Sequence, residues 1–555
     1  MALSSQVHMY TIDTSAFYTP QEQAIDRRLF KRRLWKKKLE DLFDKCDVDK
    51  KAKISKSKTK NNAGIKKLKE DLKNEFIKNK GGVRDLNPFK LRDNKIVSVF
   101  ESALTRTFKL SANTLTKDIF IIQTFYFSVI EDLIKNGFTY NREKYVCFTA
   151  SAGQIRTKKT VFLKESLLQL HSKTLMCGLT EDGIGEININ KYLAYLALCN
   201  SATDKWNSFN IEKAIVVDDM ETEVEGLVDF IDEKTYKIER KKMNVNIPHT
   251  DGCGMMLPSV SRRSFMVRLP WMKGLLVTFP FDKFIKEKGC SSKIKDIYGK
   301  EYDIIEDNIE IIFTKSQFKL WDKYSSWDEY KEYFVKYECE ASYCNKEETY
   351  FKDATLNYQV LQSLTDVTDE ELTQLASRTN ETITKFGRVR GELFRALDIH
   401  KGNTKKDNLQ RALELYPNLI QDKHTRYSLR MIKKYMVKDA LAGKLKVRGK
   451  YTFVSPDLYA FCEFLFQGNN NPQGLLKNGE VSCKLYSDSI KVDCLRNPSL
   501  YREHPVRMNV VNSNTRKWFC TNAIYTSVDD LISKILQFDK LHVELKLGYP
   551  EKGVI

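Results

Sequence analysis

Apolar positions recur at two spacings along the chain, and together they predict both helices and strands. Apolar residues three and four positions apart predict helices over 116–136, 189–199, 364–385 and 408–416. Thr368 followed by two acidic residues predicts a capped helix start inside the third of these segments. Short β-rich runs predict strands over 145–150, 160–163, 265–269, 275–279, 309–313, 451–454, 481–485 and 489–494. This mixture, with no repeat at solenoid periods, predicts an α+β protein.

Basic residues dominate the first hundred positions. Eight Lys and Arg residues lie in 27–38, where Leu29, Phe30, Leu34 and Trp35 recur at helical spacing. The pattern predicts a basic amphipathic helix, whose cations form either a solvated face or contacts to a nucleic-acid backbone. The candidate nucleic-acid-binding residues are Arg27, Arg28, Lys31, Arg32, Arg33, Lys36, Lys37 and Lys38.

The whole chain is basic as well. Its 555 residues carry 92 Lys and Arg against 73 Asp and Glu, a net charge of +19. This excess favours nucleic acid as a partner first and an anionic membrane surface second. The longest apolar stretch, 119–130, is shorter than the roughly 20 residues that cross a bilayer, and the first residues lack a signal-peptide pattern. We therefore expect a cytoplasmic protein without a membrane segment. A lysine-rich run over 50–60, followed by turn-forming residues at 61–64, predicts a flexible appendage.

Several common catalytic signatures are absent. Without GxxxxGK[ST], GxGxxG, HExxH or GxSxG, the sequence disfavours Walker ATPases, Rossmann dehydrogenases, zinc proteases and serine hydrolases. Twelve cysteines form no CxxC pair, which favours reduced thiols over a structural zinc site. The acidic residues Asp218, Asp219, Glu221 and Glu223 follow an apolar run and could hold a divalent metal, with a solvated turn as the alternative.

Longer motifs occur in a fixed order between Phe148 and Arg507. They are FTASAGQIR at 148–156, TDGCG at 250–254, SFMVR at 264–268, MKG at 272–274, TKSQFK at 314–319, LNYQ at 356–359 and RNP at 496–498. This order resembles the cellular, silencing-type RNA-dependent RNA polymerases and their phage-encoded single-chain relatives. The resemblance implies a core of two double-psi β-barrels, joined by a helical connector, that carries out templated RNA synthesis.

The resemblance also implies site residues. Lys273 and Lys319 resemble the two lysines that face the nucleoside triphosphate, and Arg496 resembles the arginine that approaches the incoming ribose. Arg268 and Gln317, in the same motifs, are further candidates for substrate binding. Nucleotide transfer needs such cations for the triphosphate, together with carboxylates that hold two magnesium ions.

The carboxylates are where this sequence departs from the family. Members carry a DxDGD loop in the second barrel, and no DxDGD occurs in the 555 residues. Asp539 resembles the first aspartate of that loop, so the implied Mg²⁺ site is incomplete, and Glu544 stands at a different spacing. The interpretations left open are an interrupted gene, a separate polypeptide that carries the remainder of the second barrel, and a degenerate homologue kept for binding.

The sequence thus predicts an α+β polymerase core with the second barrel truncated. The expected regions are a basic, largely helical N-terminal region over 1–95, an α+β region over 96–245, the first barrel over 246–350, a helical connector over 351–445 and an incomplete second barrel over 446–555. We expect a templated RNA polymerase, truncated or interrupted and inactive by itself, that binds single-stranded template and nucleoside triphosphates. The alternatives are a non-catalytic nucleic-acid-binding protein and an inhibitor or structural protein that binds another polymerase. The resemblance leaves an RNA or a DNA template open, and the Lys/Asn/Ile-rich composition suggests a bacterium or its phage as the source.

Overall fold

The computed structural model describes most of the chain and divides it into two compact units. The described residues are 6–46, 48–150, 158–180, 184–232, 234–356, 358–364, 366–403, 406–495, 505–532 and 543–544. Unit 1 comprises residues 1–211, 267–273 and 319–344, and unit 2 comprises 212–266, 274–318 and 345–555. Both units mix helices and strands, so the α+β class predicted from the sequence is confirmed.

A seven-stranded mixed sheet forms the centre of unit 1. Its strands, in spatial order, are β2 (Arg84–Asp85), β5 (Phe138–Tyr140), β6 (Glu143–Ala150), β7 (Lys159–Lys164), β4 (Leu115–Gln123), β1 (Gln6–Asp13) and β3 (Ile96–Phe100). Strand β1 runs parallel to β4, with Ile12 opposite Ile122, and antiparallel to β3. Phe120, Phe138 and Phe162 are fully buried in one hydrophobic cluster around this sheet. The helix α4 (Phe127–Asn136) contributes Val129 and Leu133 to the same cluster.

The single helix predicted over 116–136 is wrong in its first half. Residues 115–123 form the strand β4, and a helix begins only at Phe127. Ile119, Phe120, Ile121 and Ile122 are all at most 2% exposed, because both faces of this central strand are covered. A short run of apolar residues that is buried on both sides has no alternation, so its pattern does not distinguish a strand from a buried helix.

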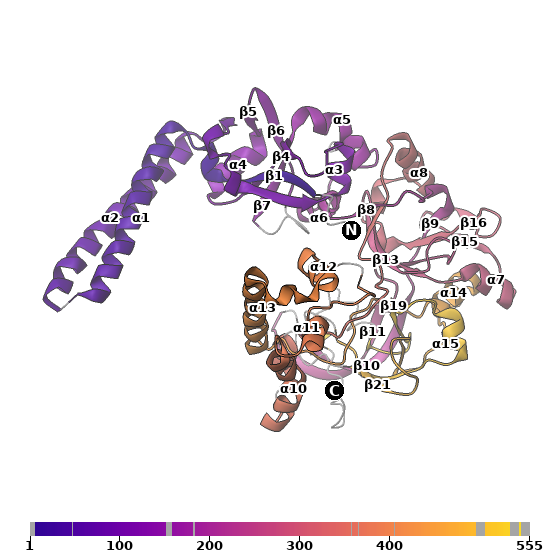
Figure 1. The fold of residues 1–555 in the computed structure, drawn as a ribbon. Helices are drawn as coiled ribbons and strands as arrows, with labels where there is room; N and C mark the ends of the chain where they lie inside the picture. The colour runs from indigo at the N-terminus through magenta and orange to yellow at the C-terminus, as the bar shows by residue number, and fades with distance from the viewer. Residues whose placement is uncertain are drawn as a thin grey trace. The chain divides into compact units, whose positions relative to one another are not determined.

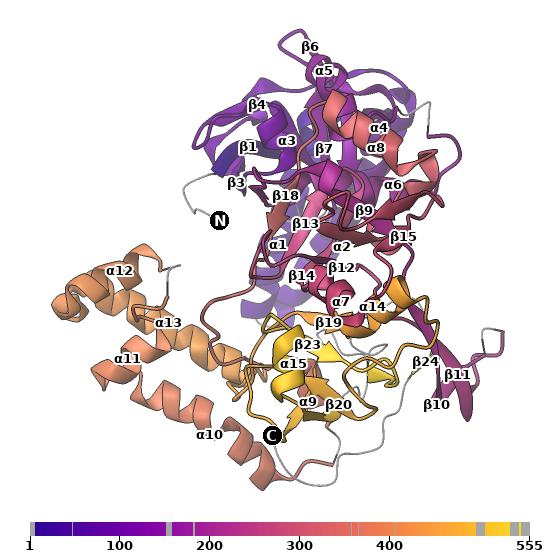
Figure 2. The ribbon, with the colours of Figure 1, turned by 90° about the vertical axis from the view of Figure 1, so that its right-hand side faces the viewer.

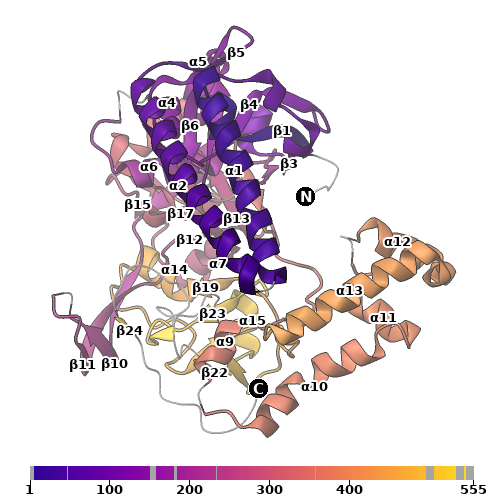
Figure 3. The same cartoon turned by 90° about the vertical axis from the view of Figure 1, so that its left-hand side faces the viewer.

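Two long helices, α1 (Pro20–Lys45) and α2 (Val48–Lys78), form an antiparallel hairpin that extends from this sheet (Figures 1 and 3). Thr19 and Glu22 form a capping box at the start of α1, with Pro20 in the first turn. One series of buried and half-buried positions of α2 has alternating spacings of three and four residues, the heptad spacing of a coiled coil. The series comprises Lys51, Ile54, Lys58, Asn61, Ile65, Leu68, Leu72 and Glu75.

The flexible appendage expected around 61–64 is therefore wrong, because α2 continues through it. Asn61 is 3% exposed and donates to the Arg32 carbonyl oxygen at 3.0 Å, so the two helices share a polar layer there. Gly64 lies against the Arg32 guanidinium, which a larger residue in its present position would meet. Paired helices satisfy these polar groups and stabilise a segment whose composition suggests a loop.

The rest of unit 1 consists of short elements. These are η1 (Thr14–Phe17), η2 (Pro88–Lys90), η3 (Asp93–Lys95), α3 (Ala103–Thr107), α5 (Glu165–Leu175), α6 (Ile189–Leu196), η4 (Ala197–Asn200), β8 (Asp204–Lys205), η7 (Trp321–Lys323), α8 (Trp327–Lys336) and β18 (Ser342–Cys344). Arg106 from α3 forms an ion pair with Glu340, just before β18, at 2.6 Å. It also donates to the carbonyl of Thr203, just before β8, at 2.6 Å. The helix predicted over 189–199 corresponds to α6 and η4 and is confirmed.

Unit 2 begins with four buried strands in the order β14 (Met272–Thr278), β12 (Cys253–Met256), β17 (Ile311–Thr314) and β9 (Ala214–Val217). β14 and the preceding β13 (Phe265–Leu269) each contribute residues to both units. A long ribbon of β10 (Glu221–Ile231) and β11 (Ile238–Pro248) follows β9, and β24 (Val543–Glu544) pairs with β10 at Asp229 and Phe230 (Figure 2). The smaller elements are η5 (Ile211–Lys213), which begins at the last residue of unit 1, α7 (Phe281–Lys288), β15 (Lys293–Lys295), β16 (Glu301–Asp303) and η6 (Lys315–Gln317).

The remainder of unit 2 contains a helical region followed by a second sheet. The helical elements are α9 (Tyr358–Ser363), α10 (Asp369–Lys385), α11 (Arg390–Ala396), α12 (Asn408–Leu415), η8 (Pro417–Gln421) and α13 (Lys423–Leu441). Thr368 caps α10 as predicted, in a capping box with Glu371. A five-stranded sheet then follows, in the order β19 (Val454–Pro456), β23 (Ile524–Thr526), β20 (Glu480–Ser482), β22 (Val506–Asn509) and β21 (Lys491–Asp493), with helices α14 (Leu458–Gln467) and α15 (Ser513–Trp518).

Among the described residues, no helix combines the length and the apolar character needed to span a bilayer. The cysteines of the described residues form no disulfide, and seven of the twelve are buried.

Candidate active site

Two of the motifs singled out in the sequence meet in unit 2 around the turn at Gly252. The backbone N–H of Gly252 donates to the Ser316 hydroxyl at 2.7 Å. Its carbonyl oxygen accepts from the backbone of Leu275 at 2.8 Å and from Nε2 of Gln317 at 3.4 Å. The TDGCG turn is therefore hydrogen-bonded both to the strand that follows MKG and to the TKSQFK segment.

The strand register produces this meeting. β12, which follows the turn, runs parallel to β14 with Cys253 opposite Leu275, and antiparallel to β17 with Met255 opposite Ile312. Every residue of β12 and β17 is buried, so their apolar side chains require a central place in the sheet. The turn before β12 and the segment after β17 consequently lie at the same edge.

Glycines allow the close approach at this edge. A Cβ on Gly274 would lie 2.5 Å from the Gly252 carbonyl oxygen and closer still to the amide of Gln317. A Cβ on Gly254 would lie 2.6 Å from Oε1 of Gln317. Gly252 itself has a φ of +69°, which favours glycine. These contacts explain the glycines of the TDGCG and MKG motifs.

Asp219 is hydrogen-bonded to both the TDGCG turn and the TKSQFK segment. Its carboxylate accepts from the Ser316 hydroxyl at 2.7 Å, the Ser316 backbone N–H at 2.8 Å and the Thr250 hydroxyl at 3.1 Å. Burial raises the pKa of Asp219, and the hydrogen bonds from Ser316 and Thr250 oppose that shift. A carboxylate with three donors is largely saturated, so Asp219 positions the two motif segments relative to each other.

The neighbouring acids are also engaged. Asp218 forms an ion pair with Lys315 at 3.2 Å, and Glu221 accepts from Asn246 across the β10–β11 ribbon at 2.7 Å. Within the described part of the chain, no three His, Cys, Asp or Glu side chains are grouped closely enough to hold a metal ion. The acidic cluster considered as a metal site from the sequence is thus occupied by protein partners, and the described residues do not fit a magnesium site.

The two predicted lysines follow these motifs directly. Lys273 precedes Gly274 and is exposed on β14, and Lys319 follows Gln317 by two residues and is half-buried. Both belong to unit 1, where the backbone N–H of Lys319 donates to the Trp271 carbonyl at 2.8 Å. This bond places the backbone of Lys319 beside the segment that carries Lys273.

Gln317 and Arg268, the other candidates in these motifs, lie partly or wholly in the interior. Gln317 is fully buried; its Oε1 accepts from the Thr314 backbone at 3.0 Å and its Nε2 donates to the Leu275 carbonyl at 3.0 Å. Arg268 donates from one terminal nitrogen to the Val267 carbonyl at 2.7 Å, and its buried Nε has no hydrogen-bond partner among the residues that the structure describes. Arg268 also lines a small cavity in unit 1 with Glu340.

Three further expectations concern other parts of the chain. Arg496 and Asp539 lie outside the described residues, as do most of FTASAGQIR and all of RNP. Glu544 is in β24, where its backbone pairs with Asp229. The predicted nucleic-acid-binding residues all lie on α1, all of them exposed except Arg33, which is half-buried.

Sequence reasoning missed the roles of Thr250 and Ser316. A signal was present, because both are hydroxyl residues inside glycine- or lysine-bearing motifs, and an isolated buried acid needs such donors. The sequence identifies their partner Asp219 only as a member of an acidic run. Its hydrogen-bond partners are 31 and 97 residues away, so no local pattern links them to it.

Residues 89–501 match the family model described as RNA dependent RNA polymerase, and this chain belongs to that family. The chain is also 49% identical over 541 residues to the DNA-directed RNA polymerase YonO of Bacillus phage SPbeta. That alignment covers 97% of this chain and 63% of the relative, so the chain spans less than two thirds of the relative's length.

Proposed function

We propose that this chain supplies the triphosphate-binding part of a templated RNA polymerase built on two double-psi β-barrels. The observation that carries the proposal is the hydrogen-bonded junction of Gly252, Ser316 and Gln317, from which Lys273 and Lys319 extend. Membership of the polymerase family and the similarity to a phage RNA polymerase support the same function.

The proposed chemistry assigns one task to each group at this edge. Lys273 and Lys319 neutralise the triphosphate, because in-line displacement at a phosphate concentrates negative charge on the attacked nucleotide. Two cations on neighbouring backbone segments both attract an anion such as a triphosphate. Gln317 and Asp219 do not contact substrate in this proposal; they hold the loops that carry the lysines.

Nucleotide binding by the full 555-residue chain tests this assignment. We expect Lys273→Ala and Lys319→Ala each to weaken the binding of a fluorescent nucleoside triphosphate by about 10- to 150-fold, the loss of one hydrogen bond to a charged group. Lys286→Ala, a change of the same charge at an exposed position of α7, should leave the dissociation constant unchanged. Equal affinities for all four proteins would refute the assignment.

Template and metal form a separate part of the proposal. The family is described as RNA dependent and the relative is named DNA-directed, so we infer single-stranded nucleic acid as the template class and leave the sugar to experiment. Because the 555 residues contain no DxDGD and Asp539 alone resembles the loop, we expect no ribonucleotide incorporation by this polypeptide at millimolar Mg²⁺.

Incorporation assays on DNA and RNA templates check that expectation. Robust synthesis that is lost on Asp539→Ala would mean that other carboxylates complete the site. A non-catalytic nucleic-acid-binding protein is the second candidate function, and the net charge of +19 is the observation that favours it. Nucleic-acid binding with no triphosphate binding would favour this second candidate.

A further inference from the structure

The α1–α2 hairpin separates the apolar residues of α1 into two groups. Leu29 and Leu39 are 0% and 4% exposed and face α2, whereas Phe30, Leu34 and Trp35 are 59%, 48% and 50% exposed. The sequence predicts a helix whose buried face carries Leu29, Phe30, Leu34 and Trp35. The helix is present, but this assignment of the buried face is wrong, because only Leu29 is buried. Three large apolar side chains remain on the outside of a helix that already has its partner.

These exposed side chains alternate with cations along one face. Lys31, Leu34 and Lys38 are spaced by three and four residues, which places them on a common stripe, and Phe30 and Trp35 flank that stripe. Leu42, 47% exposed, continues it. Among the described residues, no carboxylate lies within ion-pair distance of Lys31 or Lys38.

The hairpin as a whole is strongly basic. Between Pro20 and Lys78 there are twenty Lys and Arg residues and ten Asp and Glu residues, a net charge of +10 out of the chain's +19. An acidic partner is therefore favoured over a second copy of this basic helix, which would be repelled. Exposed apolar side chains on a positively charged hairpin indicate a partner that has both flat apolar surfaces and negative charge.

We propose that the outer face of α1, comprising Arg27, Phe30, Lys31, Leu34, Trp35 and Lys38, binds single-stranded nucleic acid. Unpaired bases stack on the rings of Phe30 and Trp35, and the cations between the rings contact phosphates. Arg27 and Lys38 are eleven residues apart, about 16 Å along the helix, a length that accommodates several nucleotides. This surface is separate in sequence from the Gly252 junction, and the inference does not depend on triphosphate binding.

The geometry also narrows the set of cations predicted from the sequence. Arg32 reaches toward Oδ1 of Asn61 at 3.4 Å and Lys36 pairs with Glu40 at 3.8 Å, so both have protein partners on or beside the α2 side. Arg27, Lys31 and Lys38 lie on the outer face with the aromatic residues. The binding strip is thus a subset of the basic run.

The test measures the affinity of the full chain for a fluorescent single-stranded oligothymidylate and an oligouridylate over a series of salt concentrations. Phe30→Ala combined with Trp35→Ala should weaken binding by more than tenfold, since each stacked base contributes about 5- to 150-fold, and should leave the salt dependence unchanged. Lys31→Ala combined with Lys38→Ala should lower the slope of log affinity against log salt by about 1.4, or 0.7 for each phosphate contact to a single strand.

Matched controls come from the same hairpin. Lys66→Ala combined with Lys67→Ala removes two exposed charges from α2, and Ile77→Ala removes an apolar side chain that is 59% exposed. Both controls should bind the strand with nearly unchanged affinity and slope. All replaced side chains are exposed, so circular dichroism should show an unchanged helix content.

Three results would overturn the inference. The first is unchanged affinity in both outer-face variants, and the second is tighter binding to duplex than to single strand. The third is an oligomer of the wild-type chain that the Phe30 and Trp35 changes dissociate, which would identify a second copy as the occupant. Lys273→Ala should retain strand affinity, so failure here and failure of the triphosphate site are distinguishable.

Discussion

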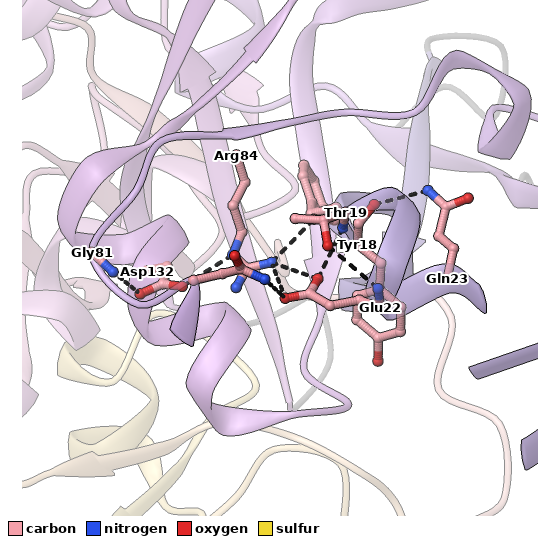
Figure 4. A network of polar contacts seen from close by, with 9 residues as sticks. Tyr18, Thr19, Glu22, Gln23, Gly81, Arg84 and Asp132 are labelled. Atoms are coloured by element: carbon pink, nitrogen blue, oxygen red, sulfur yellow. Dashed lines mark hydrogen bonds and ion pairs between the residues drawn. The ribbon is translucent and has the colours of Figure 1, made fainter. Parts of the chain in front are cut away.

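Arg84 lies at the base of the α1–α2 hairpin, where it pairs with two buried carboxylates of unit 1. Its side chain is 3% exposed, with Nε 3.0 Å from the Asp132 carboxylate and Nη1 2.9 Å from Glu22 (Figure 4). Glu22 also accepts from the backbone of Thr19 at 2.9 Å, and Asp132 accepts from the backbone of Gly81 at 3.0 Å. One guanidinium therefore connects the start of α1, the turn after α2 and the helix α4.

Replacing Arg84 by Met should destabilise this junction strongly. The change leaves Glu22 and Asp132, 0% and 3% exposed at their side chains, as two buried carboxylates without their cation. Removing one partner of a buried ion pair costs about 3–5 kcal/mol, because the remaining charge is neither solvated nor compensated. A triple variant, Arg84→Met with Glu22→Gln and Asp132→Asn, removes the charges together and should recover much of that loss.

Hydrogen–deuterium exchange of the full chain measures the effect locally. Peptides that cover the first turn of α1 and the segment around Gly81 should exchange roughly 150- to 5,000-fold faster in Arg84→Met, the equivalent of about 3–5 kcal/mol in the free energy of opening. Lys135→Met is the control, because its ion pair with Glu131 is on the solvent-exposed surface of α4, where such pairs contribute little to stability. An increase below tenfold in Arg84→Met, or no recovery in the triple variant, would refute the reasoning.

Other substitutions test the site and the packing. Gly274→Ala should lower triphosphate affinity, because the new methyl group displaces the amide of Gln317, and should lower the apparent melting temperature of the chain by several degrees in calorimetry. Gly64→Ala should instead stabilise the hairpin by about 0.5–1 kcal/mol, read from slower amide exchange in α2, since the Arg32 side chain that it meets has a flexible end. Burial raises the pKa of Asp457 to about 6, above the roughly 4 of an unfolded aspartate. The carboxyl group therefore stays protonated to a higher pH in the folded state than in the unfolded state. The free energy of unfolding of unit 2 should therefore fall as the pH rises from about 4 to about 6 and level off above it, and urea titrations of Asp457→Asn should lose this dependence.

The sequence predicts elements best where the deciding interactions are short-range. The capped helix start predicted at Thr368 is confirmed, and its partner in the capping box, Glu371, is only three residues away. The strand β4 was mistaken for a helix because its identity depends on β1 and β7, which cover its edges from more than thirty residues away in sequence. The same reason explains α1, where the choice between Leu29 and Phe30 as the buried residue is made by α2.

The candidate site shows the same division in its chemistry. The glycine and lysine motifs were recognisable because each is a contiguous stretch whose backbone and side chains act together. The role of Asp219 was not recognisable, because an acid at a strand end has the same local sequence whether it holds a metal or a loop. What distinguishes the two is the set of donors around the carboxylate, and Asp219 accepts three hydrogen bonds from Thr250 and Ser316. A buried carboxylate held by three protein donors joins the two loops that supply those donors, and such long-range partners cannot be read from the local sequence.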